Sequence, residues 1–245
     1  MRALQGGCLS LWLLASSTLW AAAPAQQYQQ LRSQATLLAV NALLYFDADP
    51  RAQPDVRHLS TVREAQQRLD ALALQLDLPA EMGDSLASLN AWLADLQAVR
   101  RDEAPRYPQL LIGLLDTRAQ LDRQSDAAYQ QVQADLQPVV RLLNRQSLDI
   151  ASLLLHAQAR SARVLGDHSL AYSEVEFAAR DQAIEQGFTQ LIALLPEQAK
   201  VLHKQRLAYR FVRQRLLDRD PGRVTGSLER YLAGIVVALD EIAAR

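Results

Sequence analysis

The feature that most constrains this chain is a helical spacing of apolar residues, which recurs between proline and glycine breaks along most of its 245 residues. Three stretches show it clearly: Val62, Ala65, Leu69, Leu72 and Leu76; Met82, Leu86, Leu89, Leu93 and Leu96; and Leu228, Tyr231 or Leu232, Ile235, Leu239 and Ile242. Residues three and four apart share one face of an α-helix, so each stretch predicts a helix that buries one face. No stretch after residue 25 alternates like a half-buried strand. The chain is therefore predicted to be all-α.

Prolines and glycines mark the expected helix ends, because proline is tolerated in the first turn of a helix but disrupts its interior. The breaks predict eight helices, over residues 26–48, 58–77, 80–103, 106–136, 139–165, 172–195, 197–219 and 222–244. Only a short connection with Pro138 separates the fourth from the fifth. The sequence leaves open whether these two form one kinked helix or two.

The eight helices resemble four helices given twice. Matching positions are Leu78-Pro79 with Leu195-Pro196, Leu121-Asp122 with Leu239-Asp240, and Gln34 with Gln146. Short connections favour antiparallel bundles, so we predict two tandem antiparallel four-helix units, over residues 26–136 and 137–245. They would pack either end to end or side by side. The alternative is that two stretches rich in leucine and alanine align by chance.

Residues 1–25 have the three parts of a secretory signal peptide. Arg2 lies near the start, an apolar run of 13 residues extends from Cys8 to Trp20, and small residues follow. The run is shorter than the ~20 residues that span a bilayer. The expected cut after Ala25 predicts a periplasmic protein whose mature chain has no transmembrane segment. Cleavage would also remove Cys8, the single cysteine, and with it any disulfide or thiolate metal site.

Charge and motifs argue against several classes of function. The mature chain would carry 25 basic and 27 acidic residues, a net charge of −2, which does not suggest nucleic-acid binding. Its histidines lack the spacing that places two metal ligands on one helical face; they are His58, His156, His168 and His203. Nucleophile elbows and glycine-rich phosphate loops are missing. We therefore expect no enzyme activity, no metal and no cofactor.

The predicted helix over residues 197–219 is unusually basic. Arg206, Arg210 and Arg213 share one of its faces. They form either a solvated face lying over neighbouring helices or a basic strip that meets an anion or an acidic partner. Two groups beside them are also assigned: Tyr209, Phe211 and Val212 are predicted to lie in the core, and Glu174, Glu176, Asp181 and Glu185 to form a solvated face.

Polar residues interrupt the apolar stripe early in the fifth predicted helix. Gln146 borders the seam of Leu143, Ile150 and Leu154, whereas Arg145 points largely away from it. A polar group beside a buried seam needs hydrogen-bond partners. Gln146 is therefore expected to have either a structural or a binding role.

The segment from Leu143 to Leu148 resembles the opening helix of the type IV pili methyl-accepting chemotaxis transducer N-terminal (PilJ-type) domain. That helix typically reads Asn-Leu-Ala-Gly-Arg-Gln-Arg-Met-Leu-Ser-Gln. Arg145-Gln146 match it, but the preceding glycine and the second arginine are missing. In the first unit the match shrinks to Leu31-Arg32-Ser33-Gln34. Such domains are extracytoplasmic four-helix sensor units, some of which occur as tandem pairs in exported proteins.

The resemblance implies that a small anion such as nitrate binds between the opening helices, with the Arg145 guanidinium as its partner. The candidate ligand-binding residues are Arg145, Gln146, Arg32 and Gln34. We thus expect an exported protein that binds a small ligand and relays this to a membrane sensor. The alternative is a non-catalytic structural or adaptor protein that docks another envelope protein through its helical faces and Arg206, Arg210 and Arg213.

Overall fold

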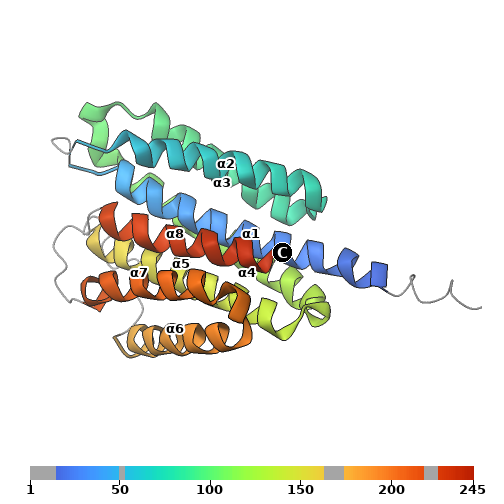
Figure 1. The fold of residues 1–245 in the computed structure, drawn as a ribbon. Coiled ribbons are helices and arrows are strands. Elements are labelled where there is room, and N and C mark those ends of the chain that lie inside the picture. Colours follow the sequence, from blue (N-terminus) through green and yellow to red (C-terminus); the bar gives the residue numbers. More distant parts are fainter. Residues whose placement is uncertain (1–14, 50–52, 163–173, 218–225) are drawn as a thin grey trace, which may run out of the picture.

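The computed structural model describes residues 15–49, 53–162, 174–217 and 226–245, which form eight α-helices and no strand (Figure 1). The α-helices are α1 (Ala15–Tyr45), α2 (Val56–Leu76), α3 (Ala80–Ala98), α4 (Tyr107–Val132), α5 (Pro138–Ser161), α6 (Glu174–Leu194), α7 (Ala199–Leu217) and α8 (Gly226–Ala243). The described residues also include the short 3-10 helices η1 (Arg101–Arg106), η2 (Gln133–Asp135) and η4 (Pro196–Gln198). The predicted all-α class is confirmed.

α4 and α5 are two helices. After η2, Leu136 and Gln137 both adopt extended backbone angles, with ψ of 142° and 144°. Steric contact with a proline ring disfavours the helical conformation in the residue before it, so Pro138 can begin a helix but separates it from the one before. Figure 1 shows that the chain reverses direction here.

The first helix extends across the expected signal-peptide cut. α1 runs from Ala15 through Pro24 and Ala25 to Tyr45. Residues 1–14, including Cys8, lie outside the described residues, and export and cleavage stay predictions. Among the helices that the structure describes, none combines the length and the hydropathy of a membrane span.

α1 lies in the middle of the molecule, between α2 and α3 on one side and α5 to α8 on the other (Figure 1). It packs against α2, α4, α5 and α8. α3 packs on α4, and in the sequence-later group α5 contacts α6, α6 contacts α7, α7 contacts α8, and α8 contacts α5. Helices α1 to α4 lie beside helices α5 to α8 (Figure 1). One continuous apolar core includes residues from all eight helices, so the division into two units stays a prediction.

The predicted apolar faces of α2, α3 and α8 are largely those that the fold buries. α3 buries all five residues of its stripe, and α8 buries Leu232 in place of Tyr231. The prediction that Phe211 lies in the core is wrong, because its side chain is 72% exposed. Tyr209 and Val212 are buried as expected. Residues two apart lie on nearly opposite sides of a helix, so burial of Tyr209 turns Phe211 outward.

Gly113 brings α4 close to α3. A Cβ at this position would lie 2.6 Å from ring atoms of Trp92, whose Nε1 donates a hydrogen bond to Thr117 Oγ1 at 3.2 Å. Gly234, in the middle of α8, would have no heavy atom within 4 Å of its Cβ. The two glycines therefore form a matched pair for testing the packing of α3 on α4.

We expect Gly113→Ala to lower the free energy of unfolding by about 1–2 kcal/mol, because displacing the Trp92 ring costs more than the gain in helix propensity. Gly234→Ala should raise it by up to about 1 kcal/mol, since only the propensity changes. Urea denaturation of both variants measures the difference. Equal effects would contradict the close approach of α3 and α4.

Candidate functional site

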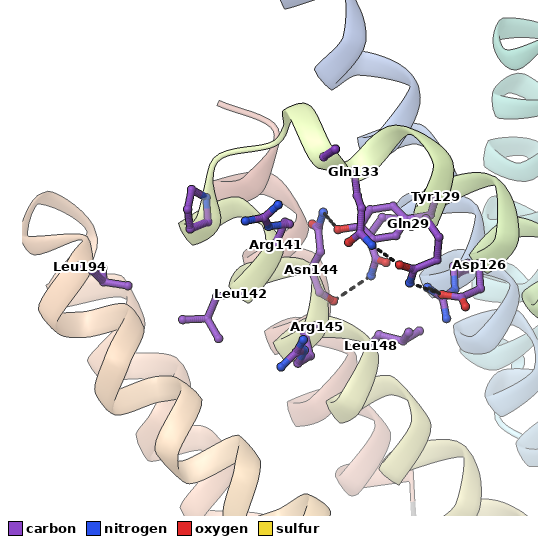
Figure 2. Close-up of a pocket in the computed structure, with 14 residues that line it drawn as sticks. Gln29, Asp126, Tyr129, Gln133, Arg141, Leu142, Asn144, Arg145, Leu148 and Leu194 are labelled. Carbon is purple, nitrogen blue, oxygen red and sulfur yellow. Dashed lines mark hydrogen bonds and ion pairs between the residues drawn. The ribbon is translucent and has the colours of Figure 1, made fainter. Parts of the chain in front are cut away.

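A groove of about 780 Å³ lies between α1, the end of α4 with η2, and the start of α5, with α6 at its edge (Figure 2). Its lining contains three arginines, one aspartate and several amides. Its polar lining includes Gln29, Arg32, Asp126, Arg141, Asn144 and Arg145. Positive charge is in excess along its walls, so the groove favours an anion over a cation.

One face of α5 supplies much of the polar wall. Asn144, Arg145 and Leu148 follow Arg141 by three, four and seven residues, which places all four on one face. Arg145 is exposed, which confirms that it points away from the core seam, and Arg141 is half-buried. Within the described parts of the chain, neither guanidinium has a carboxylate within 4 Å. Both can therefore meet an anion without breaking an existing ion pair.

Arg32 reaches the same groove from α1 but is already paired. Its Nε donates to Asp122 Oδ1 at 2.8 Å, and its Nη1 lies 2.7 Å from Asp126 Oδ1. The guanidinium is buried, and breaking such a pair by removing one partner is costly. Arg32 thus holds α1 against α4, and its charge is largely neutralised.

Asn144 is 1% exposed and lies at the meeting point of three helices. Gln29 Nε2 donates to the backbone carbonyl of Asn144 at 3.0 Å, and Asn144 Nδ2 donates to the Tyr129 hydroxyl at 3.2 Å. The Oδ1 atom of Asn144 has no hydrogen-bond partner among the described residues. A tyrosine hydroxyl donates as well as accepts, so either Nδ2 or Oδ1 of Asn144 can bond the Tyr129 hydroxyl. In each orientation the other group of the amide is left unpaired. An unpaired buried amide costs about 1–3 kcal/mol, which a ligand can recover.

The two predicted glutamines lie outside this groove. Gln146 is buried, and its Nε2 donates to the Ile184 carbonyl at 2.8 Å. Its Oε1 lies close to Gly187, and a Cβ added at Gly187 would come within 2.0 Å of this oxygen. Gln146 therefore joins α5 to α6, in line with the structural alternative. Gln34 is buried in α1. Of the four candidate residues, the structure brings Arg32 and Arg145 together at the groove.

The basic strip of α7 is paired with α6 of the same chain. Glu185 accepts from Arg206 at 2.9 Å and from Arg210 at 2.8 Å, while Arg213 donates to Asp181 at 2.6 Å. Hydrogen bonds from Arg210 and Arg206 lower the pKa of Glu185. The prediction of a solvated acidic face is wrong for Asp181, which is buried and also accepts from the Tyr209 hydroxyl at 2.8 Å. The reason is that Asp181 and Glu185 lie on the side of α6 that packs against α7.

A second buried polar cluster joins α1, α5 and α8. Ser33 Oγ donates to Asp240 Oδ2 at 2.7 Å, and Ser147 Oγ donates to Oδ1 at 2.6 Å. Asp240 is 6% exposed, and burial raises the pKa of its carboxyl to about 6 against the two hydroxyl hydrogen bonds, which lower it. Both serines lie close in sequence to groove residues, so the same two helices build the groove and this cluster.

In the described ranges, no group of three or more His, Cys, Asp or Glu side chains is placed to hold a metal ion. His168 lies outside these ranges.

Known proteins provide no further identification. The chain matches no family model, and neither a curated protein nor a solved structure is significantly similar to it. The resemblance to the PilJ-type domain therefore rests on Arg145-Gln146 and the apolar residues that follow.

Several groove residues were missed from the sequence. Arg141 could have been found, because it lies four residues before Arg145 on the same helical face. Asp126 and Tyr129 could not, because their place beside α5 depends on how α4 crosses α1.

The ionisation of Asp240 makes the free energy of unfolding depend on pH. The pKa of Asp240 in the folded protein is above the usual 3.8, so the folded state binds this proton more tightly than the unfolded state does. The resulting gain in the free energy of unfolding is complete below about pH 4 and is lost as pH rises through about 6. Two pKa units correspond to about 3 kcal/mol. We expect Asp240→Asn, whose amide can bond both serines, to raise the free energy of unfolding at pH 7.5 by about 1–3 kcal/mol and to flatten its dependence between pH 4 and 7.5.

The matched control is Asp122→Asn, at the position that corresponds to Asp240 in the first predicted unit. It weakens the ion pair with Arg32 and should therefore lower stability at pH 7.5. Urea denaturation at several pH values compares the two. A loss of stability at pH 7.5 in both variants would contradict an unfavourably ionised Asp240.

Proposed function

We propose that this chain is an exported, periplasmic helical protein that binds a small anion in the groove between α1 and α5 and relays its presence to a membrane signalling partner. The observation that carries the proposal is the pair of guanidinium groups of Arg141 and Arg145. They line one groove, on one face of α5, and are not ion-paired within the described chain. A guanidinium offers a planar fork of donors that matches an oxyanion.

The start of α5 adds to this preference. α5 begins at Pro138, which lines the groove together with Arg141 and Leu142 from its first turns. The amino end of a helix carries partial positive charge and favours a nearby anion. In the orientation in which Asn144 Oδ1 accepts from the Tyr129 hydroxyl, its Nδ2 adds an unpaired donor at the same place.

Export and relay rest on two further features. The signal-peptide pattern of residues 1–25 supports a periplasmic location. The resemblance to the PilJ-type domain supports sensing, and the groove lies between the opening helices of the two predicted units. Since α1 and α5 also pack against each other, a ligand that draws them together would change the shape presented to a partner.

The test is anion binding measured by calorimetry and thermal shift, with nitrate, sulfate, phosphate and acetate as probes. We expect saturable stabilisation by at least one of them. Loss of one charged hydrogen-bonding group costs about 1.5–3 kcal/mol, so Arg141→Ala and Arg145→Ala should each weaken the Kd by about tenfold or more.

Arg210→Ala is the matched control, because this arginine is also solvent-accessible but pairs with Glu185 away from the groove. It should leave the Kd unchanged. The absence of any response in the wild type, or an equal loss in the control, would contradict anion binding at the groove.

A second candidate function, a non-catalytic adaptor, is favoured by one apolar cluster. Leu207, Phe211 and Tyr231 are all exposed, and the rings of Phe211 and Tyr231 lie 5.1 Å apart. Contiguous exposed apolar groups of this kind can mark protein interfaces. Because Arg206, Arg210 and Arg213 are tied to α6, this cluster is better placed than the arginines to dock an envelope protein.

For this alternative we expect the double variant Leu207→Ser with Phe211→Ser to lose crosslinks to an envelope protein in cells. Leu74→Ser, at an exposed leucine on α2, should keep them. The same crosslinks in both variants would show that α7 isn't the docking face.

A further inference from the structure

The groove offers more than an inorganic anion requires. Its volume of about 780 Å³ falls in the range of 300–1,000 Å³ that is typical of pockets for organic ligands. Beside its arginines it has an apolar part, built from Leu142 of α5 and Leu194 of α6, whereas Leu148 lies on the other side of Arg145 (Figure 2). A bare oxyanion would contact the arginines and leave the leucine side chains exposed to water.

The apolar part lies next to the charged one. Leu142 comes directly after Arg141 on α5, and Figure 2 shows it projecting toward Leu194 across the opening. Leu194 is 58% exposed, so a ligand can cover it without displacing a neighbour. Burying such a side chain under an apolar group is favourable in proportion to the area removed from water.

The charged part favours a single negative charge. Asp126 lines the groove as well, and together with Asp122 it neutralises Arg32. Arg141 and Arg145 are therefore the available cations, and a doubly charged head group would meet repulsion from Asp126. Asn144 is nine-tenths buried or more, and when its Oδ1 accepts from the Tyr129 hydroxyl its Nδ2 is an unpaired donor that can complete the hydrogen bonding of the head group.

We infer that the anion bound here is organic, a carboxylate joined to a short apolar chain, with the head group at Arg141, Asn144 and Arg145 and the chain over Leu142 and Leu194. This inference rests on the proposed function and narrows the class of its ligand. It places recognition of the charge on α5 and recognition of the chain between α5 and α6.

The experiment is calorimetry of the mature protein with acetate, butanoate, hexanoate and octanoate, below the concentration at which octanoate forms micelles. Burial of one methylene group contributes about fourfold in Kd, so each methylene in this open groove should tighten the Kd by about two- to fourfold. Octyl phosphate should bind more weakly than octanoate. Tighter binding of octyl phosphate would overturn the assignment of a singly charged carboxylate.

Variants separate the two parts of the site. Leu194→Ser should flatten the dependence on chain length and leave the Kd for acetate unchanged, whereas Arg145→Ala should weaken every member of the series. Leu74→Ser, on α2, is the control for non-specific binding of the chains and should behave as wild type. Length dependence that persists in Leu194→Ser, and also in Leu142→Ser, would overturn the inference.

The outcomes also distinguish this inference from the proposed function. If nitrate or sulfate binds and the carboxylates show no effect of chain length, the groove binds anions but the ligand class is wrong. If no anion of any kind binds, the proposed function fails with it.

Discussion

The structure depends on the complete burial of the middle of α1. Every residue from Leu31 to Leu43 is buried, because this stretch contacts helices from both sides of the molecule. Three of its polar members have specific partners: Arg32 pairs with two aspartates, Ser33 bonds Asp240, and Asn41 bonds the Leu37 carbonyl and Glu229. Burial of a polar group without such a partner costs several kcal/mol. The place of α1 thus determines both the core and the groove.

The helices and their buried faces followed from the sequence, whereas their arrangement did not. Spacing alone identified the stripe from Met82 to Leu96 and the outward direction of Arg145, since both depend only on position around one helix. The stretch from Ser33 to Phe46 has no charged residue and could also have indicated the burial of α1, although no prediction was made from it. The groove could not be predicted, because it forms where Asp126 of α4 and Leu194 of α6 lie near α5. Contacts between such distant segments leave no local pattern in the sequence.

Asp122 and Asp240, which the predicted repeat places at corresponding positions, have different surroundings. Asp122 is partly exposed and has Arg32 as a counter-charge, while Asp240 is buried with two serines and no cation within 4 Å in the described chain. Ser33 and Ser147 belong to the helices that also line the groove. The groove and the Asp240 cluster therefore share the helix pair α1 and α5.

Native-state hydrogen exchange tests most directly whether α1 is the shared interior helix. The account predicts that backbone amides from Leu31 to Leu43 exchange only through global unfolding, with the same free energy as the most protected amides of α5 and α8. Exchange of these α1 amides through a local opening, while α5 and α8 remain protected, would contradict it. The fold would then be held together without α1, and a groove that uses α1 as one wall would have no stable basis.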